Sequence, residues 1–344
     1  MTPSTAPCAA SDLPDCLLVK AVDPTLFQGG LRRIHHRFNR YAATSPVPLP
    51  AAGLVVTPEI RLQSELYLPL GELRPLFYRL YQEALSYPPI LSSTPFYRCL
   101  SWADCFALLP PWLQQTPNPA SLLAMLLQER ELLSRFIFFS FLPDRFNGHG
   151  FGRYPSQLAW LRTFLSESSA SHLRILDAAC GSGEGTWELA ELLAGMGFTP
   201  RQVSLEGWTL EPLEVWAAQQ RCLPHALTRG QQYRRRLQPL VQQGWGSQIT
   251  FAVRDLCTVT EAASFDLIIC NGLLGGPLLH QPEQLTQVVR NLTGLLAPGG
   301  VLAAANRFHG GWKKLAPEQL LAELFRDRGL TVSMAGEGLA GISG

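Results

Sequence analysis

Apolar and polar positions along the second half of the chain predict strands alternating with helices. Continuous apolar runs predict strands at 173–176, 203–209, 248–253, 265–270, 301–305 and 330–334. Helical spacing between them predicts helices at 187–193, 212–221, 282–296 and 317–328. Strands that are apolar throughout and separated by helices are typical of a parallel sheet covered on both faces. The pattern therefore predicts an α/β domain.

The first half has mainly helical spacing. Helices are predicted at 25–41, 71–87, 119–141 and 156–166, the third beginning at the N-cap pair Asn118-Pro119. Residues 59–68 alternate instead, with Ile60 and Leu62 separated by polar residues, which predicts a half-buried strand. We therefore expect a mainly helical substrate or partner domain at 1–147, followed by a second domain at 148–344.

The composition excludes several classes of protein. The chain has 344 residues, 47% hydrophobic and 16% charged, with a net charge of +1, so it is long enough and apolar enough for a large core. A balanced charge provides no overall field for nucleic acid, which we do not expect as a partner. The apolar region 120–142 is interrupted by Glu129, Arg130 and other charges, so we expect no membrane span.

The eight cysteines are scattered and contain no Cys-x-x-Cys pair. This pattern predicts reduced, mostly buried thiols and a cytoplasmic protein. No group of His, Cys and acidic residues has ligand spacing, so no metal site is predicted.

The stretch 173–186 carries the clearest chemistry. An apolar run ends at Asp177, breaks into a turn with Gly181, Gly183 and Gly185, and resumes as a helix. Glycine lets a backbone approach a ligand and adopt positive φ, and the helix that follows offers free N–H groups to an anion. This order predicts a nucleotide pocket at the carboxyl end of a strand.

Several motifs in order resemble those of class I S-adenosylmethionine (SAM)-dependent methyltransferases over 171–334. They are Asp177-Ala178-Ala179-Cys180-Gly181-Ser182-Gly183, Asp255-Leu256, Phe265-Asp266-Leu267-Ile268 and Leu296-Ala297-Pro298-Gly299-Gly300. The resemblance implies an α/β, Rossmann-like class I methyltransferase sheet with a mostly helical N-terminal domain. It also implies SAM as the cofactor and methyl transfer as the reaction.

The resemblance places the cofactor residue by residue. Ala179, Cys180, Gly181 and Gly183 would form the turn around the methionine end, with Asp177 attracting its ammonium. Asp255 would accept from the adenine amino group, and Leu256 would cover the base. The family's acidic residue after the second strand is replaced by Thr209, which leaves Glu211, or Glu206, for the ribose diol. Asn271 would lie under the methionine or the substrate.

A second resemblance is to chemotaxis-receptor glutamate methyltransferases. It rests on Phe151-Gly152-Arg153-Tyr154-Pro155 and on the turn 179–185. It implies that Arg153 contacts the SAM carboxylate. The segment 270–277 lacks the arginine, tyrosine and phenylalanine of that family, which argues against a receptor glutamate as acceptor. The acceptor therefore stays open between a protein carboxylate and a small molecule.

Methyl transfer from a sulfonium mainly requires alignment. Carboxylate and thiolate acceptors need no base, whereas hydroxyl acceptors usually do. His149 and Tyr154, in the glycine-rich loop 145–155, and then His309, after the fifth strand, are the leading candidate bases; His280 is another.

Two basic segments, 31–40 and 229–236, are either solvated helix faces or patches for an acidic substrate or protein partner. An alternative function is a non-catalytic SAM-binding or protein-docking module with a methyltransferase fold.

Overall fold

We describe the protein from a computed structural model, which describes residues 17–19, 21–142, 150–167, 170–260, 264–305 and 315–344. The chain divides into two compact units. The first comprises Met1–Pro143 with Pro224–Ala226, and the second comprises Asp144–Leu223 with Leu227–Gly344. Each unit is described by itself below.

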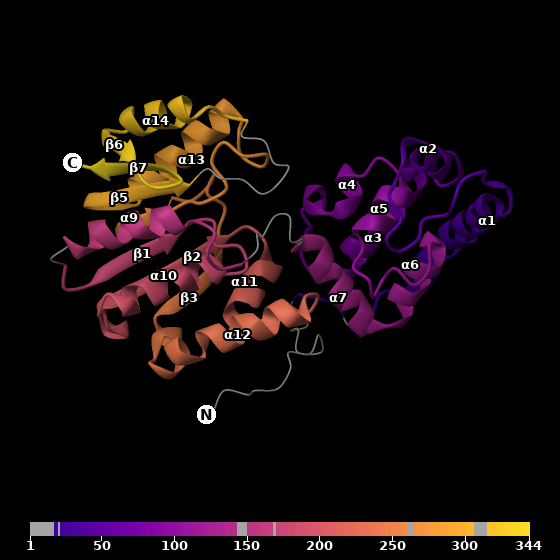
Figure 1. Ribbon diagram of the computed structural model, residues 1–344, viewed down its shortest axis with the longest axis horizontal. Helices are drawn as coiled ribbons and strands as arrows, with labels where there is room; N and C mark the ends of the chain where they lie inside the picture. The colour runs from indigo at the N-terminus through magenta and orange to yellow at the C-terminus, as the bar shows by residue number, and fades with distance from the viewer. Residues whose placement is uncertain (1–16, 20, 143–149, 168–169, 261–263, 306–314) are drawn as a thin grey trace. The chain divides into compact units, whose positions relative to one another are not determined.

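The first unit is helical in its described residues (Figure 1). Its elements are η2 (Pro24–Phe27), α1 (Gln28–Thr44), α2 (Pro58–Tyr67), α3 (Leu70–Ala84), η3 (Leu91–Ser93), α4 (Pro95–Arg98), α5 (Trp102–Leu108), α6 (Pro119–Gln128) and α7 (Arg130–Phe141). Aromatic rings fill the core: Phe77 stacks on Phe96 at 4.1 Å between centroids, and Tyr81 stacks on Phe136 at 5.8 Å. Aromatic side chains bury large apolar surfaces, and their packing here stabilises the contacts between the helices.

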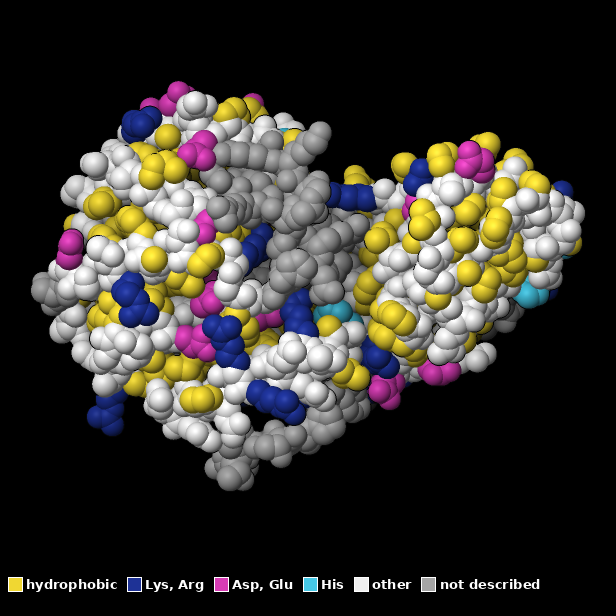
Figure 2. Space-filling view, viewed as in Figure 1, with side chains coloured by type: hydrophobic (Ala, Val, Ile, Leu, Met, Phe, Trp, Pro, Cys, Tyr) yellow, Lys and Arg dark blue, Asp and Glu magenta, His cyan; other side chains and the backbone are white. Residues whose placement is uncertain are grey.

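The predicted strand at 59–68 is wrong, because these residues form helix α2. Thr57 caps the helix by accepting from the Ile60 amide, and Pro58 occupies its first position, two strong start signals. Helical geometry separates the alternating apolar residues: Ile60 is buried, whereas Leu62 is 68% exposed. Figure 2 shows other hydrophobic side chains on the surface of this unit.

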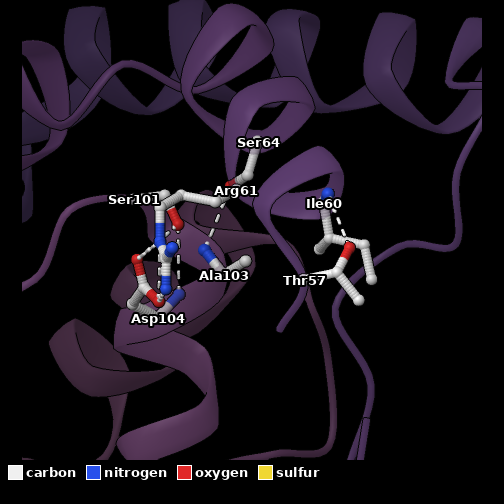
Figure 3. A network of polar contacts seen from close by, with 7 residues as sticks. All are labelled: Thr57, Ile60, Arg61, Ser64, Ser101, Ala103 and Asp104. Atoms are coloured by element: carbon white, nitrogen blue, oxygen red, sulfur yellow. Dashed lines mark hydrogen bonds and ion pairs between the residues drawn. The ribbon is translucent and has the colours of Figure 1, made fainter. Parts of the chain in front are cut away.

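Polar contacts hold α2 against α5 (Figure 3). Arg61 donates two hydrogen bonds from Nε and Nη2 to the Asp104 carboxylate at 2.9 Å each. Ser101 caps α5 and also donates to Asp104, while Ser64 accepts from the Ala103 amide at 3.0 Å. Arg61, one of the polar residues of the alternating stretch, thus binds the neighbouring helix α5.

The predicted helix 119–141 is two helices, α6 and α7. Asn118 caps α6 as expected, accepting from the Ala120 amide at 2.9 Å. Glu129 then adopts an extended conformation, with φ −114° and ψ 97°, which ends α6 and begins α7. Apolar periodicity continues across this residue, so it could not reveal the break.

The second unit contains a seven-stranded sheet in the order β3-β2-β1-β4-β5-β7-β6. The strands are β1 (Leu173–Asp177), β2 (Val203–Thr209), β3 (Ile249–Val253), β4 (Phe265–Ile269), β5 (Leu296–Ala305), β6 (Leu330–Met334) and β7 (Gly338–Ser343). Strands β1 to β5 pair in parallel, as predicted. Strand β7 was not predicted; it inserts antiparallel between β5 and β6, so the sheet is mixed.

Helices cover both faces of this sheet. They are α9 (Pro155–Ser166), α10 (Glu184–Gly195), α11 (Pro212–Gln220), α12 (Leu227–Gln242), α13 (Pro282–Gly294) and α14 (Glu318–Arg326), with the short turns η4 (Pro200–Gln202) and η5 (Trp245–Ser247). In Figure 1, α13 and α14 lie beside the part of the sheet formed by β5, β6 and β7, and α10, α11 and α12 lie beside the part formed by β1, β2 and β3. Leu285 and Val289 of α13 and Phe325 of α14 pack with Ile268 and Leu302 in one buried cluster. The α/β prediction for this part of the chain is confirmed.

Among the described residues, Cys222 departs from the pattern expected of the cysteines. Cys222 is disulfide-bonded, so the expectation of reduced thiols is wrong for this residue. Cys99, Cys105, Cys180, Cys257 and Cys270 are free. Within the described ranges, no helix is both long enough and apolar enough to cross a membrane.

Candidate functional site

The glycine turn lies between the ends of three strands. After Asp177, the Ala178 amide donates to the Ile269 carbonyl at the end of β4 (2.7 Å), and the Cys180 amide donates to the Trp208 carbonyl on β2 (3.0 Å). The predicted turn residue Gly181 has a φ of 52°. These bonds position the turn at the carboxyl end of the sheet, where open α/β sheets bind ligands.

Gly183 lies at the point where the turn enters α10, and its lack of a side chain lets Ala218 and Tyr233 pack closely against it. Its φ is +87°, and a Cβ there would lie 2.6 Å from Ala218 Cβ and 3.0 Å from the Tyr233 hydroxyl. Tyr233, on α12, donates to the Ser182 carbonyl at 3.0 Å. The turn is thus supported by α11 and α12, a role for α12 that the sequence analysis missed.

Asp177 is buried at the end of β1. Its Oδ2 accepts from the Thr186 hydroxyl at 2.7 Å, and the carboxylate also accepts from the Ala179 amide. Burial raises the pKa of Asp177 to about 6, against the lowering effect of these two bonds. A buried carboxylate of this kind gains charge stabilisation when a cation arrives.

Three acidic residues in β2, after it and in α11 have different partners. Glu206 accepts from the Trp208 indole at 3.2 Å and pairs with Arg174 at 3.9 Å. Glu211 is buried and caps α11 by accepting from the Leu213 amide. Thr209, in the position where the resemblance expects an acid, donates its hydroxyl to Glu214. Glu214 was not among the predicted residues, because its spacing from the strand differs from that of the family's acid.

Two exposed apolar side chains lie at the ends of the neighbouring strands. Leu210, after β2, is 51% exposed, and Val253, at the end of β3, is 42% exposed. Asp255 follows β3, exposed, with its Oδ1 accepting from the Cys257 amide at 2.8 Å, and Leu256 beside it is buried. Apolar faces beside a hydrogen-bond acceptor suit a flat base with an exocyclic amine. Neither Leu210 nor Val253 was among the site residues predicted from the sequence.

Residues 150–157, which we call the strap, bring Arg153 and Tyr154 to the end of β4. A Cβ on Gly272 would lie 3.0 Å from an Arg153 guanidinium nitrogen and 3.0 Å from the Tyr154 hydroxyl. The Arg153 guanidinium also lies 4.9 Å from the centre of the Tyr154 ring. Two side chains distant in sequence from Gly272 therefore converge on it.

Burial changes the chemistry of this pair. It lowers the pKa of Arg153 and raises that of Tyr154 to about 12. Tyr154 therefore keeps its proton at neutral pH, which favours a hydrogen-bond donor over the general base that the sequence suggested. The charge of Asp177 also acts on Tyr154, raising its pKa.

The predicted site residue Asn271 has strong internal partners. Its Nδ2 donates to Gln157 Oε1 at 2.6 Å, and its Oδ1 accepts from Gln157 Nε2 at 3.0 Å and from the Ala305 amide at 2.8 Å. Asn271 thus joins the strap to β4 and β5, and its contact with a cofactor or substrate stays a prediction.

The candidate bases are placed unequally. His149 and His309 lie outside the described residues. His280 precedes α13, with its Nε2 3.2 Å from Gln281 Nε2. In the described ranges, His, Cys and acidic side chains form no group of three or more that could hold a metal ion.

In both basic segments, 31–40 and 229–236, arginines form ion pairs with acidic residues of the same chain. Arg33 and Arg37 pair with Glu72 at 3.0 and 2.5 Å. Arg229 pairs with Glu184 of α10 at 2.6 Å, and Arg236 pairs with Glu191 at 2.6 Å. These contacts favour the structural interpretation for those four side chains, while a protein partner stays a prediction.

Comparisons with known proteins give similarity in structure only. No family model and no curated protein matches the sequence. The [4+2]-cyclase SpnF is 18% identical over 51% of this chain, with a TM-score of 0.35, and the match spans 57% of SpnF. A TehB-like SAM-dependent methyltransferase from Corynebacterium glutamicum ATCC 13032 is 16% identical over 56% of this chain and 86% of its own, with a TM-score of 0.35.

SAM-bound CalS10, an amino pentose methyltransferase from Micromonospora echinaspora, is 16% identical over 55% of this chain and 90% of its own, with a TM-score of 0.37. The chain's own geometry defines its fold: the strand order 3-2-1-4-5-7-6, the antiparallel β7 and the glycine turn after β1. The second unit has an α/β, Rossmann-like sheet of the class I methyltransferase type, as the resemblance implied.

Proposed function

We propose that this protein is a SAM-dependent methyltransferase. The observation that carries the proposal is the placement of Asp177 and Arg153, with opposite charges, at the carboxyl ends of β1 and β4 beside the glycine turn. The methionine end of SAM is a zwitterion. Its ammonium would lie by Asp177 and its carboxylate by Arg153, where charge-assisted hydrogen bonds hold both groups.

The adenosine end fits the other side of the turn. Leu210 and Val253 offer apolar surface, and Asp255 offers an acceptor for the adenine amine. The ribose would face the end of β2, where Thr209, Glu211 and Glu214 supply hydroxyl and carboxylate oxygens. The cofactor's two ends would thus be held by different strands, which fixes the sulfonium between them.

SAM supplies an electrophilic methyl group, and the chain's residues align it with the acceptor. The protonated Tyr154 can donate a hydrogen bond to an anionic group. An acceptor that is already a carboxylate, on a protein or a small molecule, does not have to lose a proton before it is methylated. Such an acceptor suits a site in which Tyr154 stays protonated and does not act as a base. His149 and His309 remain the candidate bases for a hydroxyl acceptor.

Calorimetry with S-adenosylhomocysteine, the demethylated product, tests the proposal. We expect binding by the parent protein and a loss of about tenfold or more in affinity for Asp177→Ala and for Arg153→Ala, since each removes a charge partner of the zwitterion. Leu62→Gln, an exposed change in the first unit, serves as the control. A parent protein that binds neither SAM nor S-adenosylhomocysteine at millimolar concentration contradicts the proposal.

A non-catalytic SAM-binding module is the second candidate, favoured by Thr209 in the position of the expected acid. Incubation of cell extract with SAM labelled in its methyl group separates the two candidates. Label that enters a specific protein or metabolite only when the parent protein is present supports the methyltransferase. Tight binding without transfer supports the module.

A further inference from the structure

The strap, residues 150–157, is anchored at its beginning by α12. The Arg236 guanidinium lies 3.9 Å from the centre of the Phe151 ring, and this distance indicates a cation–π contact. Arg236 also pairs with Glu188 at 3.5 Å, and Glu188 in turn accepts from the Gly152 amide at 2.7 Å. One arginine therefore holds the strap through a side chain and, by way of Glu188, through the backbone.

The same anchor reaches the glycine turn. The Phe151 ring packs edge-on against Tyr233 at 5.6 Å, and Tyr233 donates to the Ser182 carbonyl. Two hydrogen bonds from Arg236 to Glu191, at 2.9 and 2.6 Å, fix the guanidinium on α10. The beginning of the strap, α10, α12 and the turn thus form one packed group.

Glu337, in the turn between β6 and β7, anchors the far end of the strap. Its two carboxylate oxygens accept from the amides of Ser156 (3.0 Å) and Gln157 (2.7 Å), the first residues of α9 after Pro155. A carboxylate at a helix N-terminus satisfies free N–H groups and interacts favourably with the helix dipole. Close approach is possible because residue 336 is glycine: a Cβ there would lie 2.2 Å from the Gln157 amide nitrogen.

Arg153 and Tyr154 lie between these two anchors. We propose that Arg236 and Glu337 are positioning residues, which hold the strap at both ends and thereby set Arg153 and Tyr154 over the carboxyl end of β4. The inference rests on the proposed function, in which Arg153 binds the cofactor's carboxylate. It explains why the connection between β2 and β3 includes the additional helix α12: the helix holds the strap as well as supporting the turn.

A double-mutant cycle with S-adenosylhomocysteine affinity as the readout tests the proposal. We expect Arg236→Ala and Glu337→Ala each to weaken binding by about tenfold in the parent protein, because Arg153 loses its fixed position. In the Arg153→Ala background the same changes should weaken binding less than twofold, since they act through the missing guanidinium. A purely structural role would give equal losses in both backgrounds.

Conservative and matched variants complete the experiment. Arg236→Lys keeps the charge beside Glu188 but loses the planar contact with Phe151, so its affinity should lie between those of the parent and Arg236→Ala. Glu337→Gln keeps one acceptor oxygen and should also be intermediate. Arg235→Ala, at an exposed neighbouring position on α12, should bind like the parent.

Amide hydrogen exchange without ligand separates the anchoring from the binding. Arg236→Ala should accelerate exchange at Gly152, and Glu337→Ala should accelerate it at Ser156 and Gln157. Unchanged exchange at these amides, or equal affinity losses in both backgrounds, overturns the proposal. A parent protein that binds no S-adenosylhomocysteine contradicts the proposed function instead, and amide exchange then still decides whether the two anchors hold the strap.

Discussion

Asn271 and Gln157, 114 positions apart in sequence, exchange two hydrogen bonds through their side-chain amides. The pair joins the start of α9 to the end of β4, and the Ala305 amide adds β5 to the group. A paired, buried amide is satisfied only by its exact partner, so the two residues should behave as one unit.

We expect Asn271→Ala and Gln157→Ala each to lower the free energy of unfolding by about 2 kcal/mol, because each removes both hydrogen bonds between the two side chains. The double variant should cost little more than either single variant. Urea unfolding measures both quantities, with exposed Gln220→Ala as the control. Fully additive losses would show that the two amides do not depend on each other.

Cofactor affinity should depend on pH through Asp177, whose pKa burial raises to about 6. Below this value the carboxyl is neutral and cannot attract an ammonium, so affinity for S-adenosylhomocysteine should fall by about tenfold per pH unit on acidification from pH 6. Above about pH 7 it should level off. Near pH 6, binding should release a proton from Asp177, because the ammonium favours the ionised carboxylate. Calorimetry in buffers of different ionisation enthalpy would detect this proton.

The control for this pH dependence is Asp177→Asn, which should bind weakly at every pH. The unliganded protein should show the opposite trend in stability. A carboxyl whose folded pKa exceeds its usual value of 3.8 stabilises the fold below that value, and this contribution is lost as pH rises through about 6. A pH-independent affinity in the parent protein would contradict the role of Asp177.

The glycine turn should tolerate no side chain at Gly183. Gly183→Ala adds a Cβ at a φ of +87° and 2.6 Å from Ala218 Cβ, so both backbone strain and overpacking should destabilise the protein, by about 3 kcal/mol together. Gly197→Ala is a matched control, with a φ of +93° and open space around the new Cβ. Thermal unfolding should show the control losing only about 1 kcal/mol; equal losses would exclude crowding as a cause.

Arg61 and Asp104 should contribute to the stability of the first unit above acidic pH. Although partial burial opposes it, hydrogen bonds from Arg61 and Ser101 lower the pKa of Asp104, so the contribution is present above its usual value of 3.8 and is lost as pH falls further. We expect Arg61→Ala to lower the free energy of unfolding at pH 7, because Asp104 loses its charged hydrogen-bond partner. Arg61→Lys should recover part of this loss, since it keeps the charge without the two-bond geometry. Unfolding curves at pH 7 and pH 3 should therefore differ more for the parent than for Arg61→Ala.

Local sequence was sufficient to predict an element of secondary structure wherever one physical signal dominated. The apolar runs identified β1 to β6. In the central strands β1 and β4 most positions are buried, which requires apolar side chains on both faces, whereas the edge strands β3 and β6 keep exposed positions. Asn118-Pro119 identified the start of α6, because side-chain capping depends only on adjacent residues. At 59–68 two local signals conflicted: the alternation favoured a strand, but Thr57 and Pro58 started a helix whose Arg61 found Asp104.

The sequence by itself determined the α/β sheet, the glycine turn after β1 and the acidic residue that precedes it, since each depends on neighbouring residues. Only the tertiary structure decided where β7 pairs, that α12 supports the turn, and that Arg153 and Tyr154 reach Gly272. Contacts such as Arg236 with Phe151 and Glu337 with Gln157 join segments far apart in the chain. Their geometry depends on how the whole sheet and its helices pack, which periodicity and motif spacing do not encode.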